Sequence, residues 1–165
     1  MKNLFFICLS IVVFSGCIKS DVTCKYGDST ATVPVAEIQQ VQTYLNNNSI
    51  TDAVQSPAGF FYKITATGSG ASVVNLCSQV TVKYVGKLTN GTVFDQTPAG
   101  QTATFELGRV IIGWQKGIPL VNAGGKITLY IPPSLGYGSQ TVGTPPNQIP
   151  ANSILIFEVE VVSIS

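Results

Sequence analysis

The residues with most potential for chemistry lie in the second half of the chain, where aromatic side chains recur around a carboxylate. Phe94 and Asp95 follow an Asn-Gly pair, and Tyr137 lies between two glycines. Aromatic rings can wall a pocket for a small apolar group, while hydroxyls and carboxylates orient a ligand inside it. The same residues also suit an ordinary core, a turn-capping carboxylate and a loop anchor. Residue types alone therefore leave a binding pocket and a plain core open.

Composition excludes several classes of function. The chain has no histidine, which excludes Ser-His and Cys-His nucleophiles and any His-ligated metal site. The formal net charge is +1 and no stretch is a basic run, so nucleic acid is not an expected partner. We expect no metal and no cofactor.

Residues 1–16 have the pattern of a secretory signal peptide. Lys2 precedes an apolar run from Leu4 to Phe14, which is shorter than the ~20 residues that span a bilayer. The small residues before Cys17 resemble a bacterial lipobox, which implies cleavage there and lipidation of the cysteine. The alternative is an ordinary signal peptide with an incidental Cys17. We expect an exported bacterial lipoprotein, anchored at the periplasmic face or in the outer membrane.

Besides Cys17, two cysteines remain after the signal peptide. Cys24 and Cys77 are an even pair in an exported chain, where accessible thiols tend to oxidise. We expect a disulfide that fastens the N-terminal extension to the domain, with two unpaired thiols as the alternative.

Residues 17–56 are expected to form a tether and a short helical extension. Ile38, Val41 and Leu45 recur at helical spacing in a helix predicted from Pro34 to about Asn47. Such a helix could serve docking or dimerisation. Its apolar stripe is too short for a coiled coil, so we favour packing on its own domain and expect a monomer.

Residues 57–165 carry the pattern of a mostly β domain. Strand-forming residues alternate in five runs, at 60–65, 80–85, 103–107, 127–131 and 155–161. A helix is expected between Ile111 and Val121, and Pro119 should end or distort it. A sheet with one face covered by a short helix is an α+β fold. The Gly- and Pro-rich segment 136–150 is too long for a tight hairpin, which is typical of functional loops.

Four blocks of this region resemble the FKBP (macrolide-binding) family of peptidyl-prolyl cis/trans isomerases. The blocks are Val82–Leu88 with Asn90–Asp95, Phe105–Gly108 with Val110–Gly117, Ile131–Gly138, and Ile149–Glu160. They occur in one order between about Pro57 and the C-terminus, which is more specific than any single motif. The spacing between Gly108 and Trp114 is similar to that of the exported bacterial branch.

The resemblance implies an FKBP-like antiparallel sheet half-wrapped around a short helix, with a pocket between them. The small N-terminal helical extension lies outside the region of resemblance. The resemblance implies catalytic roles for Tyr84, Asp95, Tyr137 and Phe157. It implies substrate contacts from Phe94, Phe105, Val110, Ile111, Trp114 and Ile149.

The implied activity fits the composition, because rotation about an X-Pro bond requires neither a nucleophile nor a metal. The implied partners are proline-containing polypeptides, macrolide inhibitors and, through the lipid anchor, a membrane. The loop after Tyr137 is longer than in many members and lacks a histidine that some relatives have, which leaves substrate preference and drug affinity open. A non-catalytic peptide-binding module or chaperone using the same groove is the alternative.

Overall fold

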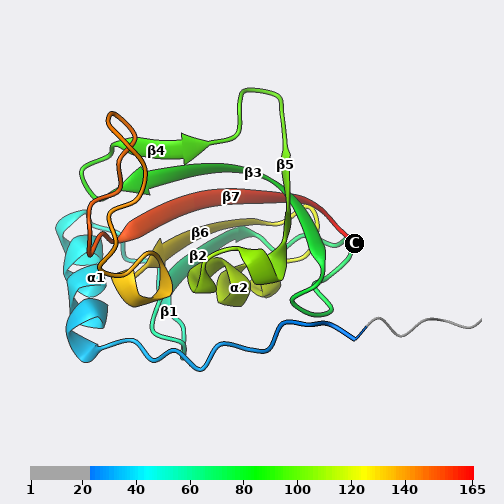
Figure 1. Ribbon diagram of the computed structural model, residues 1–165, viewed down its shortest axis with the longest axis horizontal. Helices are drawn as coiled ribbons and strands as arrows, with labels where there is room; N and C mark the ends of the chain where they lie inside the picture. Colours follow the sequence, from blue (N-terminus) through cyan, green and yellow to red (C-terminus); the bar gives the residue numbers. More distant parts are fainter. Residues whose placement is uncertain (1–22) are drawn as a thin grey trace, which may run out of the picture.

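A seven-stranded antiparallel sheet forms the body of the protein (Figure 1). The computed structural model describes residues 23–165, so the expected signal peptide and Cys17 lie outside the described residues. The strand order is β1-β2-β6-β7-β3-β4, and β5 also pairs with β3. The strands are β1 Val54–Gln55, β2 Phe61–Ala66, β3 Gln79–Leu88, β4 Val93–Gln96, β5 Ala103–Glu106, β6 Lys126–Ile131 and β7 Leu155–Ile164. The predicted α+β fold is confirmed.

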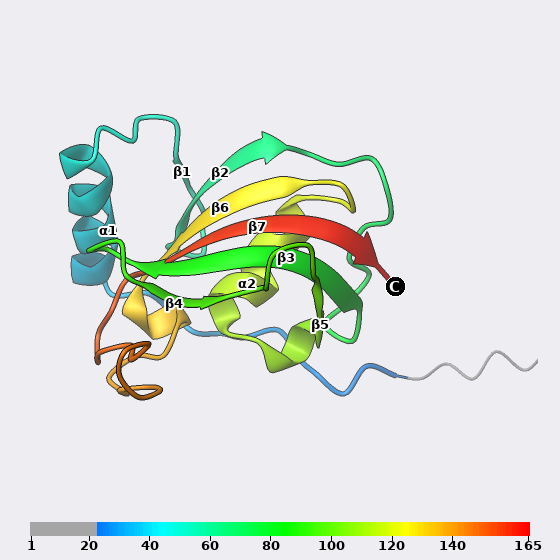
Figure 2. The same cartoon turned by 90° about the horizontal axis from the view of Figure 1, so that it is seen from above.

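The sheet curves around the short helix α2, Ile112–Gly117 (Figure 2). Trp114, Ile118 and Val121 are buried in the main core, as their helical spacing predicts. The α-helix ends at Gly117 and continues as a 3₁₀ turn, η2 Ile118–Leu120. The expected distortion at the proline is therefore confirmed, since proline lacks the N–H that an α-helix requires.

Two glycines allow α2 to approach the sheet closely. A Cβ atom at position 113 would lie 2.6 Å from Ile131 Cδ1, and one at position 117 would lie 2.6 Å from Leu129 Cδ2. Any larger residue would push the helix away from β6, because packed interiors leave no room for an extra methyl group. Gly113 and Gly117 thus fix the height at which Trp114 lies over the sheet.

Helix α1, Val35–Asn47, packs on the opposite face of the sheet. A second buried cluster consists of Val41, Leu45, Phe61, Tyr130 and Ile156. Its strand residues alternate with those that face α2, since successive side chains of a strand point to opposite faces. The helix therefore packs on its own domain, as favoured above. Neither α1 nor any other helix within residues 23–165 is long and apolar enough to cross a bilayer.

Residues 23–33, here called the strap, run along the domain beneath α2 in Figure 1, although the sequence predicts a tether. The expected disulfide is present: Cys24 is bonded to Cys77, with Cα atoms 5.6 Å apart. Lys116 Nζ of α2 donates a hydrogen bond to the Ser29 carbonyl at 3.1 Å. Lys116 and Ser29 are 87 residues apart in sequence, so the local pattern gave no sign of this second contact.

Three short elements differ from the sequence expectation. The strands β1 and β4 were not predicted: β1 has only two residues, and β4 buries only Phe94, so neither shows an alternating apolar pattern. Leu107, expected at the end of the third strand, instead opens the 3₁₀ turn η1, Leu107–Arg109. This turn leads the chain from the edge of the sheet into α2.

Candidate functional site

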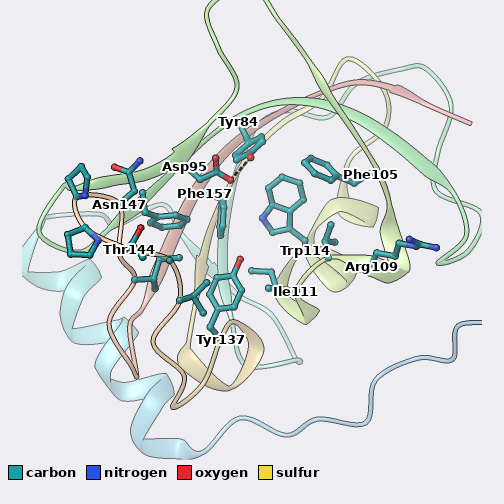
Figure 3. Close-up of a pocket in the computed structure, with 17 residues that line it drawn as sticks. Tyr84, Asp95, Phe105, Arg109, Ile111, Trp114, Tyr137, Thr144, Asn147 and Phe157 are labelled. Atoms are coloured by element: carbon teal, nitrogen blue, oxygen red, sulfur yellow. Dashed lines mark hydrogen bonds between the residues drawn. The ribbon is translucent and has the colours of Figure 1, made fainter.

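A pocket of about 630 Å³ lies between the sheet, α2 and the loop that precedes β7 (Figure 3). The structure brings together all ten side chains that the sequence assigned to catalysis or substrate binding. These are Tyr84, Phe94, Asp95, Phe105, Val110, Ile111, Trp114, Tyr137, Ile149 and Phe157. The lining is completed by residues that the sequence did not assign to the site, namely Arg109, Val142, Gly143, Thr144, Pro145, Pro146 and Asn147. The chemical roles of the ten residues stay predictions.

Trp114 of α2 forms the floor of the pocket and is only 3% exposed. The centroid of its ring lies 5.3 Å from that of Tyr84, 5.2 Å from Phe157 and 5.9 Å from Phe105. All three pairs are edge-to-face, with interplanar angles between 83° and 89°. Such pairs contribute about 0.5–1.5 kcal/mol each beyond burial, so the floor is apolar and held from three sides. The Trp114 Nε1 group is buried without a hydrogen-bond partner among the described residues.

A glycine in the middle of β3 makes room for one wall. Phe94 of β4 and Phe157 of β7 meet edge to face, with centroids 5.4 Å apart. A Cβ atom at position 86 would lie 2.7 Å from Phe94 Cε2 and 2.9 Å from Phe157 Cε1. Gly86 is therefore needed for the two rings to close this side of the pocket.

The Tyr84 hydroxyl donates a hydrogen bond to Asp95 Oδ2 at 2.5 Å. This bond links β3 to β4, which are neighbours in the sheet. Burial, followed by the hydrogen bond and negative charge of Asp95, raises the pKa of Tyr84 above its usual 10.0. Tyr84 thus stays a neutral hydroxyl whose proton is already engaged by Asp95.

Tyr137 enters the pocket just after the 3₁₀ turn η3, Pro133–Leu135. Its side chain is 37% exposed, and its hydroxyl points into the pocket in Figure 3 without a hydrogen bond to any residue in 23–165. Burial, and then the negative charge of Asp95, raises the pKa of Tyr137. Tyr137 therefore presents a neutral O–H donor that is free to bind a ligand carbonyl.

Arg109 contributes to the pocket without directing its charge into it. Figure 3 shows its guanidinium turned away from Trp114. Its Nε donates to Glu106 Oε2 at 2.7 Å and to the Tyr26 hydroxyl at 3.0 Å. Sequence reasoning missed Arg109 because the partner Tyr26 lies in the strap. It identified the loop 136–150 as functional but assigned none of residues 142–147 to the site.

The lining combines apolar rings with neutral hydroxyls and one carboxylate. Within the part of the chain that the structure describes, no three His, Cys, Asp or Glu side chains gather closely enough to hold a metal ion. Such a pocket can enclose a compact apolar ring, exclude water from it and orient a neighbouring carbonyl through Tyr137.

Changing Tyr84 to Phe tests the coupling between Tyr84 and Asp95. The variant keeps the ring but loses a hydrogen bond to a charged group, so its free energy of unfolding at pH 7 should fall by about 1–2 kcal/mol. The folded-state pKa of Tyr84 is raised above the unfolded value, so this stabilisation is complete below about pH 10 and declines as the pH rises further.

Urea denaturation across this pH range measures the effect, and an absorbance titration of tyrosinate provides a second observable. Tyr84→Phe should remove one late-titrating tyrosine from that titration. A stability difference that is the same at pH 7 and above pH 10 would contradict the assignment.

The comparisons with known proteins agree with this geometry. A family model described as FKBP-type peptidyl-prolyl cis-trans isomerase matches residues 70–162. The chain is 44% identical over 111 residues to the "FKBP-type peptidyl-prolyl cis-trans isomerase FkpA" of Buchnera aphidicola subsp. Schizaphis graminum, which covers 67% of this chain and 42% of the relative. It is 40% identical over 119 residues to the "Outer membrane protein MIP" of Legionella longbeachae, which covers 72% of this chain and 49% of the relative.

Among solved structures, FkpA from Escherichia coli aligns with a TM-score of 0.66 and 32% identity, over 79% of this chain and 60% of that one. The chain spans about half the length of the curated relatives named above, between 42% and 49%. The family match at residues 70–162 nevertheless includes every residue that lines the pocket. The protein therefore belongs to the FKBP-type peptidyl-prolyl cis-trans isomerase family.

Proposed function

We propose that the protein is an active peptidyl-prolyl cis/trans isomerase that rotates X-Pro bonds in other polypeptides. The observation that carries this proposal is the water-excluding aromatic pocket over Trp114, with the unengaged hydroxyl of Tyr137 beside it. Its membership in the FKBP-type family supports the same activity.

Rotation about an X-Pro bond is slow because amide resonance must be broken. The barrier is about 18–20 kcal/mol and no covalent bond changes, so the enzyme must bind the twisted amide more tightly than either planar form. A dry, apolar pocket disfavours the charge-separated resonance form of the planar amide. An acceleration of about 10⁴ to 10⁶ requires only about 5–8 kcal/mol.

Each part of the pocket has a proposed role in binding the twisted amide more tightly than the planar forms. Trp114 and Phe157 grip the prolyl ring, and Phe94 closes the wall beside them. The hydroxyl of Tyr137 donates to a substrate carbonyl and fixes the orientation of the peptide. Asp95 holds the Tyr84 hydroxyl, so the two tyrosines act differently: one is tied to the sheet and the other is free for substrate.

We further propose that the protein acts on exported polypeptides outside the bacterial cytoplasm. A disulfide between Cys24 and Cys77 suits an oxidising compartment. A relative is named as an outer membrane protein, and the lipobox-like sequence before Cys17 supports a lipid anchor. Six residues lie between Cys17 and Cys24, so the seven Cα–Cα steps that join them reach at most about 25 Å. A lipidated Cys17 would therefore keep the domain close to the membrane surface.

Catalysed exchange of short X-Pro peptides, followed by NMR, tests the activity. The wild-type protein should accelerate exchange well above the uncatalysed rate. Tyr137→Phe should lower kcat/KM by about three- to tenfold, because one hydrogen bond to the substrate is lost. Phe157→Leu should lower it by about tenfold or more, because the ring no longer packs against Trp114.

Tyr62→Phe serves as the matched control, since Tyr62 lies on β2 outside the pocket. Circular dichroism shows whether each variant is folded. A folded wild-type protein with no catalysis, but with saturable peptide binding that Phe157→Leu weakens, would replace the isomerase by the peptide-binding alternative.

Metabolic labelling with a palmitate analogue in a bacterial host tests the anchor. The wild-type chain should take up the label and sediment with membranes, and Cys17→Ser should abolish both. Cys8→Ser is the control, because Cys8 lies within the expected signal peptide and should not affect labelling. Equal labelling of wild type and Cys17→Ser would rule out the lipid anchor at this position.

A further inference from the structure

The N-terminal segment contacts two turns that lead into the pocket lining, although it lies outside the residues that match the family model. The strap and α1 precede the matched range 70–162. We propose that this segment braces the pocket at two points, with Tyr26 and Glu37 as positioning residues for the isomerase, an inference that rests on the proposed function.

The first brace is a clamp between Tyr26 and the turn η1. The Tyr26 ring packs directly on Gly108, where a Cβ atom would overlap the ring. The Tyr26 hydroxyl donates to Glu106 Oε2 at 3.2 Å and accepts from Arg109 Nε at 3.0 Å. Arg109 Nε also donates to the same carboxylate oxygen at 2.7 Å, so the three side chains form a closed set of hydrogen bonds.

This clamp holds a segment that builds one wall. The turn η1 leads directly to Val110 and Ile111, which line the pocket, and then to the helix that carries Trp114. The clamp keeps the guanidinium of Arg109 on the outer side, so only the stem of that side chain contributes to the lining (Figure 3). Without these hydrogen bonds the long side chain of Arg109 would sample many rotamers beside the pocket.

The strap and the turn η1 are both joined to the loop that precedes β3. Cys77, two residues before β3, is bonded to Cys24, which lies two residues before Tyr26. The neighbouring Leu76 carbonyl accepts the Gly108 N–H at 2.6 Å. The strap and the turn η1 are therefore held by adjacent residues, which fixes Tyr26 in register with Gly108.

The second brace lies at the opposite wall. Glu37 of α1 accepts a hydrogen bond from the Ser134 backbone N–H through Oε2 at 2.9 Å. Ser134 belongs to η3, and amides in the first turn of such a helix have no acceptor within it. A carboxylate at this position is a charge-assisted cap. It fixes the turn that delivers Tyr137, whose hydroxyl faces the pocket (Figure 3).

The test measures kcat, KM and tryptophan emission in the full disulfide-bonded chain. Tyr26→Phe keeps the ring on Gly108 but breaks the hydroxyl bonds to Glu106 and Arg109. Glu37→Ala removes the cap, whereas Glu37→Gln retains an oxygen that can accept the Ser134 N–H. Gln39→Ala, at an exposed position of α1, and Tyr62→Phe are the matched controls. Trp114 is the only tryptophan, so its emission reports on the pocket floor.

Tyr26→Phe and Glu37→Ala should each lower kcat/KM by about three- to tenfold, while both proteins remain folded. Glu37→Gln should recover most of the loss. Tyr26→Phe should also shift the Trp114 emission. Because the two braces hold different walls, the double variant should show the product of the separate effects.

The two proposals fail in different ways. An inactive wild-type protein would overturn the isomerase, and with it the catalytic role of the braces. An active wild type whose Tyr26→Phe and Glu37→Ala variants match Gln39→Ala in kcat/KM would overturn the braces alone. Losses that disappear once rates are corrected for the folded fraction, measured by urea denaturation, would reduce Tyr26 and Glu37 to structural residues and also overturn the inference.

Discussion

Gly113 and Gly117 bring α2 against Ile131 and Leu129 of β6, and the pocket depends on that approach. Because both residues lack a Cβ atom, α2 lies close enough to the sheet for the Trp114 ring to contact Tyr84 and Phe157. Gly86 repeats the principle on β3, where the missing side chain lets Phe94 and Phe157 meet. The core and the site therefore share side chains, because aromatic rings that pack against Trp114 in the core also line the pocket.

This origin explains the chemistry that the pocket can support. A site built from core rings is apolar, which suits a reaction whose transition state is a twisted, less polar amide. The two tyrosine hydroxyls in the pocket have different roles. The Tyr84 hydroxyl donates a hydrogen bond to Asp95, whereas the Tyr137 hydroxyl points into the pocket and can bind a ligand. No nucleophile is needed, which agrees with a chain that contains no histidine. The N-terminal segment would then adjust the walls from outside, through Tyr26 at one turn and Glu37 at another.

Local sequence patterns predicted the parts that depend on local physics. Strand-forming patterns identified five of the seven strands, Pro119 marked the end of α2, and the four family blocks collected all ten side chains that the pocket brings together. Local patterns could not reveal contacts between distant residues. Tyr26 lies 83 residues from Arg109, and nothing around Tyr26 distinguishes it from a residue in a free tether. The two-residue strand β1 is likewise defined by its pairing with β2 rather than by its own composition.

The central claim is that the pocket acts by shape and exclusion of water, without proton transfer. The dependence of kcat/KM on pH and on D₂O tests this claim most directly. Since the pKa values of Tyr84 and Tyr137 are both raised above 10.0, neither hydroxyl should titrate between about pH 6 and pH 9. The account predicts a flat profile over that range and a rate ratio in H₂O and D₂O of about 1. A bell-shaped profile would show that activity depends on titrating groups, and a ratio above about 2 would show a proton moving in the transition state; either result would contradict the account.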